Sequence, residues 1–234
     1  AKSNPSNMGW QRDLSVSFEK IGDVQWAQGD LAGALKSFSD GHAIIERLAK
    51  ADPDNAGWQG GLVRSYLSIG DVQKTQGDLA GALKSFSDGH AIIERLAKAD
   101  PDDAVWQREL SLLFNEVGDV HVAQGDLAGA LKSYQAGLAI FNRLAKADPD
   151  NVDRQRDLWF SVGRIASAYR DSGDNTKALN FYRQGRAILS RLTKISPDDA
   201  QRKQDLAWIN QQIAALAPSR VEHGRDPRTP LSRR

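Results

Sequence analysis

Residues 29–54 read GDLAGALKSFSDGHAIIERLAKADPD, and residues 77–102 repeat the same letters without a change. The stretch returns in a looser form at residues 125–150 and at residues 173–198, so each copy begins 48 residues after the previous one. A fixed period of this size is typical of chains built from stacked supersecondary units that cover one another's apolar faces. The sequence therefore predicts a repeat architecture.

Each unit contains two segments with the apolar spacing of an amphipathic helix, in steps of three and four residues. In the first unit, the first segment carries Trp10, Leu14, Phe18 and Ile21. The apolar stripe of the second segment consists of Leu31, Ala34, Leu35, Phe38, Gly41, Ile45 and Leu48. Each unit is therefore predicted to be a helical hairpin.

Turn residues separate these segments. Gly29 can adopt the left-handed conformation that ends a helix, and Asp30 can cap the next helix by accepting its free backbone N–H groups. Pro53 then prevents the second helix from continuing.

Residues 1–10 (AKSNPSNMGW) also align with residues 49–58 (AKADPDNAGW), which indicates the end of an earlier unit. The predicted division is residues 1–9 as the end of a preceding repeat, 10–57, 58–105, 106–153 and 154–201 as four repeats, 202–216 as a C-terminal capping helix and 217–234 as a disordered basic tail.

Composition excludes several classes of function. The chain has 234 residues, of which 40% are hydrophobic and 26% are charged, and its formal net charge is +1. A body so close to neutral argues against a nucleic-acid partner, which requires a basic patch. No apolar run is long enough for a membrane span, and no secretory leader opens the chain, so a cytoplasmic location without membrane contact is expected. Cysteine is absent, which excludes disulfides and thiolate chemistry.

The pattern of each unit resembles the tetratricopeptide repeat family. The shared pattern is an aromatic residue, a large–small pair, a glycine-containing turn, small–aromatic–small positions on the second helix and a closing proline. The first unit carries it as Phe18, Ile21–Gly22, Gly29–Asp30, Ala34, Phe38, Gly41 and Pro53. The usual unit of the family has 34 residues, so the resemblance implies an elongated variant. It implies an all-α fold, a right-handed α-solenoid of helix-turn-helix repeats with a C-terminal capping helix.

Residues that carry chemistry are not arranged as a catalytic site. His42 and His90 are copies of one repeat position, which Leu138 and Arg186 fill in the later units. A position that accepts such different side chains is not suited to a general base or a metal ligand. The Gly–Asp pairs fit turns better than a phosphate-binding loop. The sequence thus predicts no enzyme activity, no catalytic residue, no cofactor and no metal.

The resemblance places ligand-facing positions on the first helix of each unit, which lines the concave groove in the family. The positions that it marks are Val16, Glu19, Asp23, Trp26, Arg64, Leu67, Asp71, Lys74, Leu112, Asn115, Asp119, Val122 and Arg170. Of these, Asp23, Asp71 and Asp119 form a repeated row of carboxylates that could receive basic side chains of a partner, or could be solvated or paired within their helices. Trp26 could be an aromatic anchor in the groove or could pack against the next unit.

Four arginines repeat on the second helices: Arg47, Arg95, Arg143 and Arg191. They are interpreted as structural partners of acids such as Asp13, Glu109 and Asp157. The function implied by the resemblance is a scaffold that binds a peptide or partner protein in the groove, and in bacteria such arrays resemble modules attached to signalling or effector domains. The alternative is a self-assembling module whose copies stack head to tail through the apolar N-terminal end.

Overall fold

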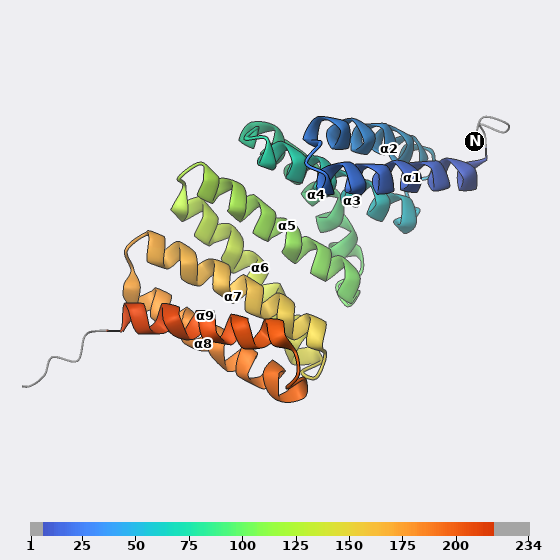
Figure 1. The fold of residues 1–234 in the computed structure, drawn as a ribbon. Coiled ribbons are helices and arrows are strands. Elements are labelled where there is room, and N and C mark those ends of the chain that lie inside the picture. The colour runs from blue at the N-terminus through green and yellow to red at the C-terminus, as the bar shows by residue number, and fades with distance from the viewer. Residues whose placement is uncertain (1–6, 218–234) are drawn as a thin grey trace, which may run out of the picture.

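The computed structural model describes residues 7–217, and these residues form nine α-helices and no strand (Figure 1). The helices are α1 (Met8–Ala27), α2 (Leu31–Ala51), α3 (Ala56–Thr75), α4 (Leu79–Ala99), α5 (Ala104–Ala123), α6 (Leu127–Ala147), α7 (Val152–Asp171), α8 (Asn175–Ile195) and α9 (Ala200–Leu216). Each odd-numbered helix begins 48 residues after the previous one, as the sequence period predicts. The all-α fold is confirmed. The predictions for residues 1–6 and 218–234 lie outside the described residues.

The turns between paired helices follow from glycine and aspartate at fixed positions. Gly29, Gly77, Gly125 and Gly173 all have φ near +80°, between 78° and 82°. L side chains rarely adopt this conformation, so glycine is needed at each of these turns. The following aspartate caps the second helix: the Asp30 carboxylate, for example, accepts a hydrogen bond from the Gly33 backbone N–H at 2.9 Å.

A close approach of the two helices in each of the first three hairpins depends on a second set of glycines. A Cβ atom at Gly22, Gly70 or Gly118 would overlap the ring of Phe38, Phe86 or Tyr134 respectively. The aromatic ring thus occupies the space that a side chain on the first helix would need. In the fourth hairpin the same position is Ala166, which is buried beside Tyr182.

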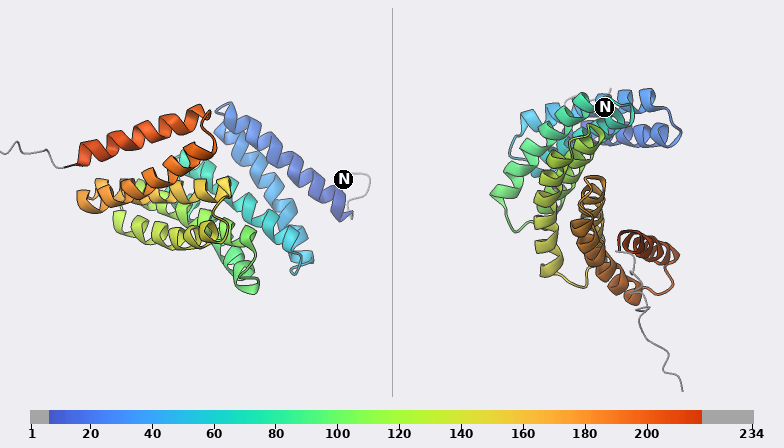
Figure 2. Two further views of the ribbon diagram at one scale, coloured as in Figure 1. Left: turned by 90° about the horizontal axis from the view of Figure 1, so that it is seen from below. Right: turned by 90° about the vertical axis from the view of Figure 1, so that its left-hand side faces the viewer.

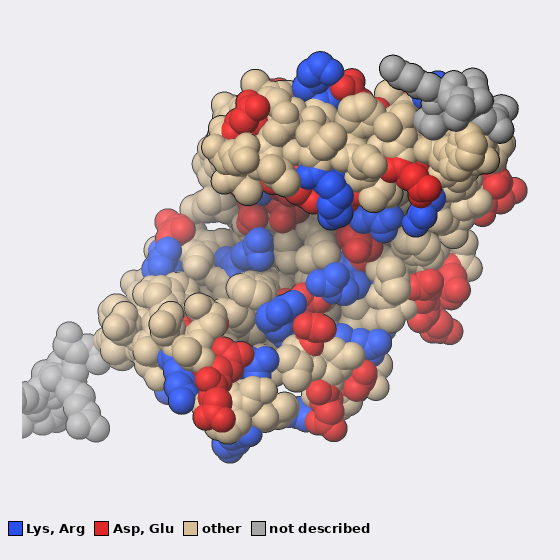
Figure 3. Space-filling view, turned by 45° about the vertical axis from the view of Figure 1, so that its right-hand side comes forward, with Lys and Arg blue, Asp and Glu red and all other residues tan. Residues whose placement is uncertain are grey.

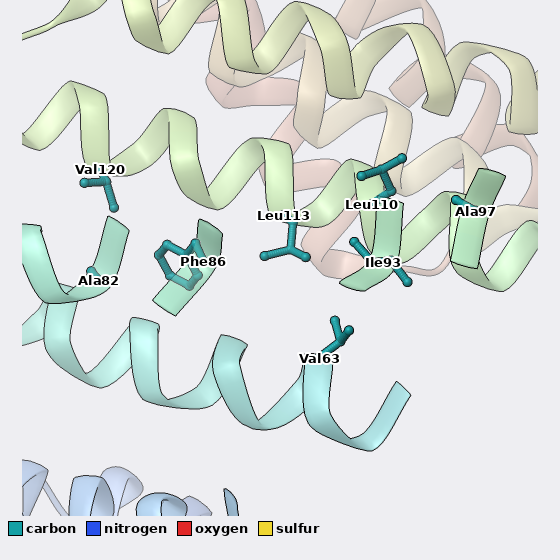
Figure 4. Close-up of a cluster of buried hydrophobic side chains, with 8 residues drawn as sticks. All are labelled: Val63, Ala82, Phe86, Ile93, Ala97, Leu110, Leu113 and Val120. Atoms are coloured by element: carbon teal, nitrogen blue, oxygen red, sulfur yellow. The ribbon is translucent and has the colours of Figure 1, made fainter. Parts of the chain in front are cut away.

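The core is a series of clusters, each shared between neighbouring hairpins. The largest set contains Val63 from α3, Ala82, Phe86, Ile93 and Ala97 from α4, and Leu110, Leu113 and Val120 from α5 (Figure 4). The second helix of one hairpin therefore packs against the first helix of the next. Burial of this kind is the main favourable contribution to stability, and it extends without interruption from α2 to α9.

Glutamine side chains join the ends of successive hairpins. Gln59 on α3 donates a hydrogen bond to the Ala49 carbonyl of α2 at 3.3 Å, and Gln107 and Gln155 make the equivalent bond to Ala97 and Ala145. Arg95 and Arg143 in turn donate to the side-chain oxygens of Gln59 and Gln107.

The predicted acidic partners of the repeated arginines were therefore wrong. Arg95 and Arg143 bind the glutamines of this seam, and Arg191 binds Asp150 at 2.8 Å. Asp157 is paired instead with Arg108 on α5, at 2.5 and 3.2 Å. The sequence register identified the arginines as structural, but it did not identify which polar groups lie opposite them.

The hairpins follow a curved path from α1 at one end to α9 at the other (Figure 2). The predicted capping helix corresponds to α9, which contacts α8 through Ile209, a residue that is almost fully buried. Among residues 7–217, none of the helices combines the length and hydropathy needed to cross a bilayer. The same residues contain no cluster of potential metal ligands.

Candidate functional site

The first helices of the hairpins line two concave regions. Val16 and Glu19 of α1 and Arg64 of α3 line a small pocket that is closed on its inner side by Phe38 and Ile45 of α2. Asp119 and Val122 of α5 belong to a larger hollow that reaches across α7 to α9. Five of the predicted positions are thus brought to concave surfaces, in two separate groups.

The larger region, here called the C-terminal hollow, has a volume of about 550 Å³. Its lining includes Asp119, Val122, Phe160, Gly163, Arg164 and Trp208. The space-filling view shows one face of the molecule hollowed between the helices nearest the N-terminus and those nearest the C-terminus, with basic and acidic side chains close together along it (Figure 3). Ligand sites are typically concave regions of this size with aromatic lining and few polar groups.

Two exposed aromatic side chains border the C-terminal hollow. Phe160 on α7 is 47% exposed and Trp208 on α9 is 42% exposed. Trp159 supports Phe160 with a ring-centroid distance of 4.5 Å, and the buried Tyr182 meets Trp208 edge to face at 6.0 Å. Both rings are therefore held against the helices while one side stays open to a partner.

A glycine forms part of the lining of the same hollow. A Cβ atom added at Gly163 would meet no other atom within 4 Å, unlike the glycines that face the rings inside the hairpins. Glycine within a helix costs about 0.5–1 kcal/mol relative to alanine. Since packing does not require glycine here, its effect is to leave the hollow open.

Charged groups on this side of the molecule are paired between neighbouring hairpins. Arg164 on α7 donates three hydrogen bonds to the Asp119 carboxylate on α5, at 3.0–3.3 Å, and Asp119 also accepts one from the Tyr134 hydroxyl at 2.5 Å. Lys74 on α3 pairs with Glu116 on α5, and Arg170 on α7 donates to Gln212 on α9 at 3.1 Å. These contacts form a polar ladder that runs from α3 to α9.

The environment of the Arg164–Asp119 pair keeps Arg164 charged. Partial burial lowers the pKa of Arg164, but the hydrogen bonds to Asp119 and the negative charges of Asp119 and Glu116 together outweigh this effect, so the pKa is raised overall. Burial and the hydrogen bond to the same carboxylate raise the pKa of Tyr134, so its hydroxyl remains a donor. The pair is an ion pair between neighbouring hairpins.

Comparison with known proteins places this geometry in a recognised architecture. No family model matches the sequence, and no curated protein matches it. Among solved structures, the chain is similar to a signal transduction ATPase with numerous domains and a tetratricopeptide repeat sensor from Pyrococcus horikoshii, with a TM-score of 0.66 and 14% identity over 88% of this chain and 27% of that one. It is similar to BtubC (BKLC) from P. vanneervenii, with a TM-score of 0.62 and 14% identity over 99% and 90% of the two chains. It is also similar to the apo form of RapI, with a TM-score of 0.62 and 13% identity over 87% and 67% of the two chains.

The chain has a tetratricopeptide-like helical-repeat fold. At these identities the likeness establishes the fold alone, and the chain spans only about a quarter of the length of the Pyrococcus ATPase. In helical-repeat proteins the side chains that differ between otherwise similar units are candidates for recognition, whereas the copied ones are needed for stacking.

Several predicted groove residues have other roles in this helical-repeat fold. Asn115 is only 2% exposed and is therefore not on the groove surface. Leu67 and Leu112 are half-buried and pack against core clusters. Trp26 meets Phe38 of its own hairpin edge to face at 6.3 Å, and it packs against the cluster that also contains Val72 of α3.

The carboxylate row is also occupied within the chain. Asp23 pairs with Lys20 and Asp71 pairs with Lys74, both at 3.1 Å, while Asp119 is bound by Arg164. These pairings support the alternative in which the aspartates are satisfied locally. They leave no row of free carboxylates for the basic side chains of a partner.

Sequence reasoning missed Phe160, Gly163, Arg164 and Trp208, although the repeat register contained the signal. Phe160 is 144 residues and Trp208 is 192 residues after Val16, which are whole multiples of the 48-residue period. Val16, Arg64 and Leu112 thus occupy one repeat position, and the two exposed aromatic residues occupy the same position in the next two units. Extending the register into the fourth and fifth units would have identified them.

Proposed function

We propose that the chain is a non-catalytic scaffold that binds a polypeptide segment in the C-terminal hollow. The observation that carries the proposal is the open space at Gly163, in a hollow that the exposed rings of Phe160 and Trp208 also line. Aromatic residues held in a concave site are frequent binding hot spots, because they bury a large area and lose little conformational entropy. The tetratricopeptide sensor of the Pyrococcus ATPase supports the proposal by analogy.

The chemistry of the hollow favours an apolar or aromatic anchor on the partner. Arg164 and Asp119 neutralise each other, and Val122 adds an exposed aliphatic surface beside them. An apolar side chain can fill the space at Gly163 without breaking this pair. The paired charges would then orient the partner's backbone through hydrogen bonds at the rim.

The alternative function is head-to-tail self-assembly, in which the N-terminal end of one copy packs against the C-terminal end of the next. The two ends of the molecule are not complementary surfaces for such packing. On the first helix of a hairpin, three repeat positions contact the second helix. On α9 these positions are Ala207, Asn210 and Ala214, and all three are exposed. They contain no large apolar side chain. Stacking would therefore place the apolar end at α1 against a surface that offers little area to bury.

The test is a selection of peptides from a phage-displayed random library on the immobilised full chain. We expect peptides with a shared aromatic or aliphatic anchor, with binding lost in Trp208→Ala and in Gly163→Trp, which fills the hollow from its floor. The matched control is Val105→Ala, because Val105 is an exposed apolar residue on α5 outside the lining of the hollow. Peptides that bind the Gly163→Trp variant as well as the natural chain would rule out the hollow as the site.

A further inference from the structure

The outward side of α1 carries large apolar side chains that no described residue covers. This surface, here called the outer face of α1, consists of Trp10, Leu14, Ile21 and Val24, all of which are exposed. The next first helix carries Trp58, Leu62, Ile69 and Val72 at the same repeat positions. Leu14 is 36% exposed against 8% for Leu62, and Val24 is 55% exposed against 0% for Val72.

The repeat register shows what covers these positions elsewhere in the molecule. On α3, Val72 packs against Ala34 and Phe38 of α2, and Leu62 packs against the cluster that contains Ile45 and Leu48. The same arrangement recurs where α4 covers α5, α6 covers α7 and α8 covers α9. In each case the covering element is an amphipathic helix with small residues near its start and branched aliphatic residues toward its end.

Sequence identity makes the covering helix chemically specific. The segments LAGALKSFSDGHAIIERLAKA at residues 31–51 and residues 79–99 are identical, although one covers α3 and the other covers α5. One helix sequence is thus complementary to two different first helices. The outer face of α1 offers the same positions, with tryptophan, leucine, isoleucine and valine in place.

We propose that the outer face of α1 is a docking site for an amphipathic helix with the residue pattern of α2. The docked helix needs small residues at the positions of Ala34 and Ala49, so that the large side chains of α1 can approach its axis. It needs branched aliphatic residues at the positions of Ile44, Ile45 and Leu48. The α1 helix of a second copy of the chain fits this face less well, because large side chains would then face large side chains.

The proposal is tested with a labelled synthetic peptide that has the sequence of residues 29–54, added to the full chain. We expect saturable binding by fluorescence anisotropy, and a loss of roughly tenfold or more in the Leu14→Asp/Val24→Asp variant, because docking would bury unpaired carboxylates. Both residues are exposed in the chain, so the substitutions leave its fold intact. Val105→Asp is the control, since Val105 is an exposed apolar residue that lies outside the outer face of α1.

An isolated peptide lacks the tertiary packing that supplies most of the stability of helices in proteins, and a fused chain removes that difficulty. Residues 29–48 are duplicated directly before Ala1, which continues the register because residues 1–2 align with residues 49–50. We expect slower hydrogen exchange throughout α1, and no such protection when the added copies of Ile44, Ile45 and Leu48 are serine. Equal exchange in the two fused chains would overturn the proposal, as would light-scattering evidence that the natural chain dimerises through Leu14 and Val24.

Discussion

At the scale of single residues, one polar pair shows how duplication followed by substitution leaves unsatisfied groups in the core. His42 on α2 and Ser65 on α3 are hydrogen-bonded at 2.9 Å. In the next unit His90 remains but the serine position is Leu113, and in the third the histidine position is Leu138 while Ser161 has the hydroxyl. Ser161 Oγ is buried without a hydrogen-bond partner, and so is Nε2 of His90, although His42 bonds Ser65 through Nδ1.

Replacing Ser161 with alanine should therefore stabilise the chain. The fully buried hydroxyl has lost its contacts with water without gaining a protein partner, a penalty of about 1–3 kcal/mol. Ser65→Ala is the matched control, and it should destabilise the chain by about 1 kcal/mol because the bond to His42 is lost. Urea denaturation followed by circular dichroism measures both changes, and a lower midpoint for Ser161→Ala would contradict the argument.

The two histidines should also make stability depend on pH. Partial burial lowers the pKa values of His42 and His90 below 6.5, more than nearby Glu46, Asp88 and Glu94 raise them. The unfolded chain then binds more protons than the folded chain in the window from 6.5 down to the folded pKa values, so stability falls as the pH falls through that window. Above pH 6.5 the contribution of the histidines is constant.

The chain itself supplies the substitution that tests this effect, because the third unit has leucine at the histidine position. The thermal midpoint of the His42→Leu/His90→Leu variant should fall less between pH 7 and pH 5 than that of the natural chain. Carboxylates and their partners are unchanged in the variant, so the difference between the two curves of thermal midpoint against pH gives the contribution of the histidines. Parallel curves would show that burial does not depress the two pKa values.

At the scale of elements, the same substitution of glycine should have opposite effects on two helices. Gly70→Ala places a methyl group against the Phe86 ring, and such overpacking typically costs about 1–3 kcal/mol. Gly163→Ala places the methyl group in open space and improves helix propensity, which should add about 0.5–1 kcal/mol to stability. Thermal denaturation of both variants is the measurement, and a loss of stability in Gly163→Ala would mean that its surroundings are closed.

The helices themselves follow from local sequence, whereas the site depends on contacts between units. Gly29, Asp30 and Pro53 specify a turn and a stop through backbone chemistry, so the hairpins could be predicted from one chain. Which acid lies opposite Arg164, and that Asn115 faces inward, are set by the angle at which neighbouring hairpins pack. That angle is not encoded in the period, and the assignment of groove residues failed where it depended on the angle.

At the scale of the whole molecule, stability and curvature depend on contacts between neighbours, because each hairpin touches only the hairpins beside it. The polar ladder adds contacts between first helices on one side of the stack, from Lys74–Glu116 through Asp119–Arg164 to Arg170–Gln212. Contacts on one side of a stack hold neighbouring first helices together on that side. The ladder should therefore help to set the curvature of the molecule, in addition to its stability.

Arg164→Leu tests this role directly. The substitution leaves the half-buried Asp119 with only the Tyr134 hydroxyl, and we expect a loss of about 1–3 kcal/mol in the free energy of unfolding. We also expect a larger radius of gyration by small-angle X-ray scattering, because α5 and α7 would separate on the side of the hollow. In Arg164→Leu/Asp119→Leu the two leucines can pack together, so most of the lost stability should return while the two single substitutions remain costly. If Arg164→Leu unfolds at the same denaturant concentration and scatters like the natural chain, the packing of α6 between α5 and α7 alone determines the curvature.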